Sequence, residues 1–146
     1  MTVELVKQLV PRLACDRVVR LEGGWTSDTF EVDGAWIVQI ARSAYAATTL
    51  RHQVSVLPRR APHLGVTVPS PELVSDEPTA ILYRKLEGQS CDEVPDGTWP
   101  EQLGRLLRRL HDVSPSQIGL EPVGPEALRE RHRIACDRIR GSVVPR

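Results

Sequence analysis

The feature that most constrains the fold is a pair of adjacent glycines, Gly23-Gly24, that interrupts a run of β-prone sequence. Residues 17–22 precede the pair, and residues 28–33 and 35–41 follow it on either side of an Asp33-Gly34 turn. Branched and aromatic side chains favour strands, and an Asp-Gly pair between two such runs is a strong hairpin signal. The pattern predicts three consecutive antiparallel strands, with a glycine loop between the first two.

One helix is predicted before these strands in the sequence and another after them. Apolar spacing predicts a short helix over residues 3–14, which Pro11 should end or bend. A longer helix is predicted from Ser43, as N-cap, to about Arg60, with its end marked by Pro58. Its predicted buried stripe consists of Ala47, Leu50, Val54 and Leu57.

Further along, a hairpin is predicted from strands at 72–75 and 79–86 around Asp76-Glu77-Pro78, which brings the sheet to five strands. A capping-box pattern, Thr98-Trp99-Pro100-Glu101, opens a helix that should end near His111. A last, arginine-rich helix is predicted over residues 126–140. The predicted fold class is α+β: a five-stranded antiparallel sheet with a packed helix, then a linker and C-terminal helices.

Composition limits the classes of partner and the compartment. The chain has 19 basic and 19 acidic residues, so its net charge is zero, which argues against nucleic-acid and anionic-membrane partners. Its three cysteines include no CxxC pair and suit reduced thiols. No signal sequence or membrane-spanning run is evident. We therefore expect a soluble, cytoplasmic protein.

Several short motifs occur in an order that resembles a known family: Gly23-Gly24-Trp25 with Thr29-Phe30, the strand Trp36 to Arg42, Leu57-Pro58-Arg59 with Ala61 to Leu64, Val68-Pro69 with Pro71, Leu86-Glu87-Gly88, and Leu103 to His111. The element order resembles the N-terminal lobe of the protein-kinase-like fold. The motifs themselves are similar to those of the aminoglycoside phosphotransferase family. The resemblance covers residues 3–140. It implies a nucleotide-binding lobe at 1–88, a hinge or linker at 89–97, and the helical start of an incomplete C-terminal lobe at 98–146.

The resemblance implies a nucleotide site, for ATP or GTP with Mg²⁺, between the glycine loop and the end of the fifth strand. Phosphates would lie beneath Gly23 and Gly24, because backbone amides approach phosphate closely where side chains are absent. The hydroxyls of Thr26 and Ser27 would add donors. The adenine would meet the backbone of the hinge, whose candidate residues are Tyr83, Arg84 and Lys85.

The same resemblance places two glutamines where a kinase-like site has an ion pair. Gln39 matches the third-strand cation that holds the phosphates, and Gln53 matches the glutamate that pairs with it. An amide offers phosphate only a dipole, so nucleotide binding by this chain should be weak or absent. Arg42, on the opposite strand face, is interpreted as a surface cation, and Asp28, Glu31 and Asp33 as solvated hairpin carboxylates.

Family members carry an HGDxxxxN catalytic loop and a Mg²⁺-binding aspartate, and this sequence ends at Arg146 before either. We therefore expect an N-terminal or truncated part of a small-molecule O-phosphotransferase, inactive alone, whose hydroxyl acceptor binds only with the C-terminal lobe. The alternative is a non-catalytic nucleotide-binding or protein-interaction remnant. His132 and Cys136 have metal-ligand spacing but lack a second local pair, so no metal site is predicted. The leucine face of residues 103–110 should be exposed and could support self-association.

Overall fold

A computed structural model of the chain describes residues 3–88, 99–120, 124–130 and 132–133. The chain forms two compact units, Met1–Val113 and Ser114–Arg146. The second contains the short 3₁₀ helix η1 (Pro115–Ile118) and helical residues 125–130. The predicted linker at 89–97, the cap Thr98 and most of the predicted final helix lie outside the described residues.

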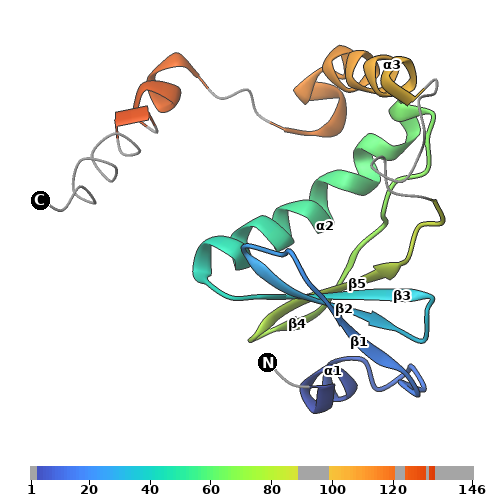
Figure 1. Ribbon diagram of the computed structural model, residues 1–146. Helices are drawn as coiled ribbons and strands as arrows, with labels where there is room; N and C mark the ends of the chain where they lie inside the picture. The colour runs from blue at the N-terminus through green and yellow to red at the C-terminus, as the bar shows by residue number, and fades with distance from the viewer. Residues whose placement is uncertain (1–2, 89–98, 121–123, 131, 134–146) are drawn as a thin grey trace, which may run out of the picture. The chain divides into compact units, whose positions relative to one another are not determined.

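The first unit is built on the predicted five-stranded antiparallel sheet (Figure 1). Its strands are β1 (Val18–Leu21), β2 (Ser27–Val32), β3 (Trp36–Ala41), β4 (Glu72–Asp76) and β5 (Thr79–Arg84). The spatial order is β1-β2-β3-β5-β4, so β5 pairs with β3 and leaves β4 at the edge. The α+β class and the strand count are confirmed.

The helix α1 (Val3–Leu9) covers one side of the sheet and ends before Pro11, as predicted. Its Val6 side chain and the following Val10 are fully buried with alternate strand residues, which makes this side the main apolar core. The strand members of the cluster are Phe30, Val32, Val38, Ile40, Ala80 and Leu82. Complete burial of a side chain of this size contributes about 1.5–3 kcal/mol.

The helix α2 (Ala44–Leu64) lies on the opposite side of the sheet, chiefly against β5 and β3 (Figure 1). Ser43 caps its N-terminus as predicted, since its Oγ accepts the Ala46 N–H at 3.2 Å. The predicted end at Pro58 is wrong: the helix continues through Pro58 and Pro62. Both prolines are exposed on the same face, where water can reach the carbonyls that lose their partners.

Two contacts favour the extra turns of α2. Leu64, at the end of the helix, is only 5% exposed. Gly65 then ends the helix in the left-handed conformation (φ 64°), and Arg109 Nη1 donates to the Leu64 carbonyl at 3.0 Å. The helix therefore ends at a glycine cap supported by a side chain from another helix.

The buried stripe of α2 is rotated from the prediction. Ala46, Leu50 and Leu64 are buried, whereas the predicted Ala47 is only half-buried. Gln53 lies one turn after Leu50 and two turns after Ala46, so it falls within this stripe and faces the sheet.

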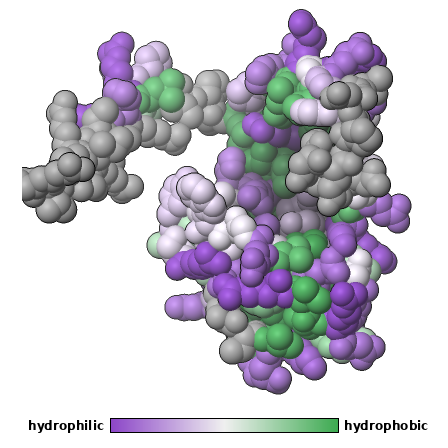
Figure 2. Space-filling model, viewed as in Figure 1, coloured by the Kyte–Doolittle hydropathy of each residue, from purple (hydrophilic) through white to green (hydrophobic). Residues whose placement is uncertain are grey.

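The helix α3 (Trp99–Asp112) is strongly amphipathic, but none of its residues is buried. Its Leu103 and Leu107 side chains are 44% and 43% exposed. Figure 2 shows apolar surface among hydrophilic side chains in this region. The exposed leucine face agrees with the expectation, while self-association through it stays a prediction. Within the described residues, no helix combines the length and apolar character needed to cross a membrane.

Candidate functional site

The glycine loop lies between the end of β1 and the start of β2. Gly23 adopts φ +96°, and a Cβ atom placed there would have nothing within 4 Å. A Cβ at Gly24 would instead meet the Ser27 carbonyl oxygen at 2.6 Å, so this position requires glycine. Thr26 is exposed, whereas Ser27 is buried as the first residue of β2. The loop thus offers open backbone at Gly23 and one accessible hydroxyl at Thr26.

An arginine pair and a buried carboxylate hold this loop. Asp28 is 5% exposed, and its Oδ1 accepts from Arg20 Nη2 at 2.6 Å and from Arg42 Nη2 and Nε at 2.7 and 3.1 Å. Arg42 Nη1 also donates to the Gly24 carbonyl at 2.9 Å, and its backbone N–H donates to the Thr26 carbonyl at 3.1 Å. Arg42 is exposed, as the interpretation of it as a surface cation implies, but it is also paired. The interpretation of Asp28 as a solvated carboxylate was wrong.

These contacts lower the pKa of Asp28 and so make the stability of the fold depend on pH. Hydrogen bonds from Arg42, reinforced by Arg20, hold the pKa of the Asp28 carboxyl below its usual value. A carboxylate with a lowered folded-state pKa stabilises the fold above its unfolded-state pKa of about 3.9, and that stabilisation is lost as the pH falls through the folded-state pKa.

We therefore expect Asp28→Asn to reduce the free energy of unfolding by about 1–3 kcal/mol near pH 7, because charge-assisted bonds are lost. The reduction should shrink at about pH 2.5, because the Asp28 carboxyl of the unfolded state is then largely protonated and folding has to release that proton. Urea denaturation at both pH values checks this. The matched control is Asp76→Asn, whose 78% exposed side chain pairs with Arg51 at 3.3 Å and should contribute little. Equal losses for Asp28→Asn at both pH values would contradict the ion pairing.

The α2 side of the sheet carries the other candidate residues. Opposed residues share a side of the sheet, and two such rows cross from β1 to β5: Val19, Glu31, Ile37 and Tyr83 form one, and Leu21, Thr29, Gln39 and Ile81 form the next. Since α2 lies mainly over β5 and β3, the rows remain accessible towards β1, where Leu21 is 38% exposed. We call this surface, defined by the exposed Leu21 and the half-buried Thr29, Glu31 and Gln39, the open sheet face; the neighbouring Ile37 is buried.

Gln39 and Gln53 lie on two elements that are in contact, β3 and α2. Gln39 is half-buried at the centre of β3, on the open sheet face. Gln53 is half-buried on the sheet-facing stripe of α2. Neither side chain carries a charge, and no hydrogen bond joins the two within the described part of the chain. The two positions therefore carry neither the cation nor the anion of the ion pair that the resemblance implies, and their pairing stays a prediction.

The end of β5 divides its side chains between the two sides of the sheet. Tyr83 is half-buried on the α2 side, and burial raises the pKa of its hydroxyl above the usual value. Arg84 points to the other side, with its guanidinium 4.5 Å from the centre of the Trp36 ring. Its side chain is thus used by a cation–π contact, which leaves only its backbone for a ligand.

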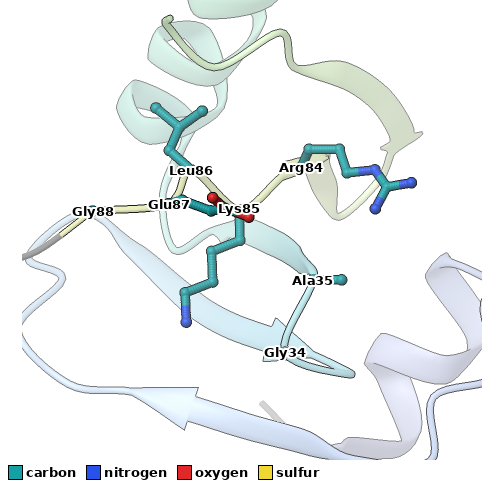
Figure 3. Close-up of a pocket in the computed structure, with 7 residues that line it drawn as sticks. All are labelled: Gly34, Ala35, Arg84, Lys85, Leu86, Glu87 and Gly88. Carbon is teal, nitrogen blue, oxygen red and sulfur yellow. The ribbon is translucent and has the colours of Figure 1, made fainter.

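Lys85 ties the segment after β5 to the open sheet face. Its Nζ donates to Glu31 Oε2 at 2.5 Å, and its backbone N–H donates to the Ala35 carbonyl at 2.9 Å. Residues 84–88 and Gly34-Ala35 line a pocket of about 490 Å³. Figure 3 shows that the side chains of Arg84, Lys85 and Leu86 point in different directions from this segment. Glu31 is therefore an ion-pair partner, and the interpretation of it as a solvated carboxylate was wrong.

Asp33 is exposed, as expected, and it also has a structural role. Its carboxylate accepts the backbone N–H groups of Cys15 and Arg17 at 3.0 and 2.8 Å, which fixes the connection between α1 and β1. Within the described residues, no group of three or more His, Cys, Asp or Glu side chains could hold a metal ion. Cys91 and Cys136 lie outside those residues.

Comparison with known proteins places the chain in a family. The model of a phosphotransferase enzyme family matches residues 17–142, which is most of the chain. The chain belongs to this phosphotransferase family. The resemblance inferred from the glycine loop, the third strand and the leucine helix is thereby confirmed. None of the curated proteins matches the sequence.

Solved structures of phosphotransferases share the fold at low sequence identity. A GDP complex of aminoglycoside 2'-phosphotransferase-IIIa is 21% identical, with a TM-score of 0.73, and the match covers 97% of this chain and 51% of that one. Macrolide 2'-phosphotransferase from Brachybacterium faecium is 21% identical, with a TM-score of 0.66 and coverage of 98% and 56%. An ADP-bound aminoglycoside phosphotransferase has a TM-score of 0.59 at 15% identity, with coverage of 78% and 41%. This chain spans about half the length of the first two.

Sequence reasoning missed the Asp28–Arg42 pair, although the signal was present. In the hairpin around Asp33-Gly34, Asp28 lies opposite Ile40, and Arg42 follows Ile40 by two residues. Strand alternation therefore places Asp28 and Arg42 on the same side as diagonal neighbours, within reach of a long side chain. The Lys85–Glu31 pair had no such local signal, because Lys85 lies beyond the end of β5.

Proposed function

We propose that the chain supplies the nucleotide-binding part of an O-phosphotransferase that transfers the terminal phosphate of ATP or GTP to a hydroxyl of a small molecule. The observation that carries the proposal is spatial. The glycine loop, Gln39 and the segment after β5 border one open sheet face in a chain that belongs to a phosphotransferase family. Solved relatives of the same fold were obtained with GDP and ADP, which supports a nucleotide as the ligand.

The residues present fit the phosphates in part. Backbone at Gly23 is open to a close approach, and Thr26 offers an exposed hydroxyl. Gln39 supplies only an amide dipole, so the expected affinity is low. A bound nucleotide would supply the phosphoryl group for transfer. The described carboxylates form no metal-binding cluster, so we assign no Mg²⁺ ligand to this part of the chain.

We assign neither catalysis nor acceptor recognition to residues of this sequence. The 146 residues contain no His-Gly-Asp sequence, so the catalytic loop that the family resemblance implies is not among them. The acceptor class follows only at a coarse level, as an aminoglycoside, a macrolide or another small hydroxyl compound. We therefore propose that this chain does not transfer phosphate by itself.

Calorimetric titration with ATP, GTP and adenosine, with and without Mg²⁺, tests the proposal. We expect saturable binding of a nucleoside triphosphate with a dissociation constant between about 10 μM and 1 mM, equivalent to about 4–7 kcal/mol. Adenosine should bind more weakly, because it lacks the phosphates that the glycine loop would contact. No saturable binding of either triphosphate at about 10 mM would contradict the proposed function.

A further inference from the structure

Arg42 holds the glycine loop at two backbone carbonyls, those of Gly24 and Thr26. Its guanidinium bridges the buried Asp28 carboxylate and the Gly24 carbonyl, and its backbone N–H holds the Thr26 carbonyl. Arg42 lies at the end of β3, on the side opposite Gln39, so its charge does not face the open sheet face. It therefore cannot replace the missing cation directly, although it can act through the loop.

The bond to Gly24 determines the direction of the next amide. In a trans peptide the carbonyl and the following N–H point in opposite directions within one plane. The Gly24 carbonyl points to Arg42, so the Trp25 N–H points away from the guanidinium. Trp25 itself is 94% exposed and packs against nothing that could hold the loop in its place. The orientation of this amide therefore depends on the Arg42 contact.

We propose that Arg42, anchored by Asp28, is a positioning residue that orients the Gly24–Trp25 peptide so that the Trp25 N–H can donate to a nucleotide phosphate. This inference rests on the proposed nucleotide-binding function. The forked guanidinium makes bonds to Asp28 and Gly24 at the same time, which the single ammonium of lysine cannot reproduce in the same geometry. The charge at position 42 alone is therefore insufficient.

The test compares Arg42→Lys with the wild-type chain by two readouts. The first is the ¹⁵N order parameter of the Trp25 amide without nucleotide, which we expect to be about 0.8 in the wild type and below about 0.6 in the variant. The second is affinity for MgATP, which should fall about 10-fold, the loss expected for one charge-assisted contact. Affinity for adenosine should stay unchanged, since adenosine has no phosphate.

Asp28→Asn is the second variant and should reproduce both effects more weakly, because Arg42 loses its anchor. Arg51→Lys, at an exposed ion pair distant in sequence from the loop, is the matched control and should change neither readout. An unchanged order parameter, or equal losses for MgATP and adenosine, overturns the inference. If the wild type binds no triphosphate, the proposed function fails, and the phosphate role of the Trp25 amide fails with it. If the wild type binds MgATP and Arg42→Lys binds it equally well, only the inference is rejected.

Discussion

Replacement of Gln39 by lysine is expected to raise the affinity of the chain for MgATP by about 10- to 100-fold. The amide at this position is half-buried on the open sheet face, between Thr29 of β2 and Ile81 of β5. A lysine there would offer a full charge to the phosphates in place of a dipole, and a charge-assisted contact contributes about 1.5–3 kcal/mol. Adding Gln53→Glu should increase the gain by giving the ammonium a partner on α2.

Two variants control for this result in calorimetric titrations. Gln8→Lys introduces the same charge at an exposed position of α1, on the other side of the sheet, and should leave the affinity unchanged. Gln39→Met keeps the length of the side chain without its dipole and should weaken binding. If Gln39→Lys bound MgATP no better than the wild type, the position would have no part in phosphate binding, which would favour a non-catalytic remnant.

The largest effect on stability is expected for Phe30→Ala. Among the residues that the structure describes, Phe30 has the largest fully buried side chain, 1% exposed, and it lies in the core between α1 and the sheet. Truncation of a buried phenylalanine removes its burial and leaves a cavity, which together cost about 3–5 kcal/mol. Because small domains are stable by only about 5–15 kcal/mol, much of the total would be lost.

Urea denaturation followed by circular dichroism measures this loss. The control is Trp25→Ala, which removes a larger aromatic side chain that is 94% exposed and should change the free energy of unfolding by less than about 0.5 kcal/mol. A loss below about 1 kcal/mol for Phe30→Ala would mean that the α1 side of the sheet is not the main core.

The strands and their turns were predictable because their signals are local. Alternation around Asp33-Gly34 defines β2 and β3, and the Gly23-Gly24 pair separates β1 from them. The position of β5 between β3 and β4 has no local signal, since it depends on which edge of the second hairpin meets β3. The end of α2 was mispredicted because the intrinsic cost of Pro58 was outweighed by burial of Leu64 and by the cap at Gly65.

The candidate site divides in the same way. The resemblance supplied the positions Gln39 and Gln53, and strand and helix periodicity supplied their side of the sheet. Arg84 was predicted to meet the nucleotide through its backbone, which stays a prediction. Strand alternation turns its side chain to the other side from Tyr83, where it stacks on Trp36. The Asp28–Arg42 pair was predictable from the hairpin register, whereas the bond from Arg42 to the Gly24 carbonyl depends on the conformation of the glycine loop and was not.

The most direct test of a nucleotide site on the open sheet face is a map of amide chemical-shift changes as MgATP is added to the ¹⁵N-labelled chain. We expect saturable changes at Gly23 to Ser27, at Gln39 and at Tyr83 to Lys85, with little change at Val6 and Val10 on the opposite side of the sheet. Changes confined to the α1 side, or no saturable change at about 10 mM MgATP, would contradict the assignment of this face to nucleotide binding.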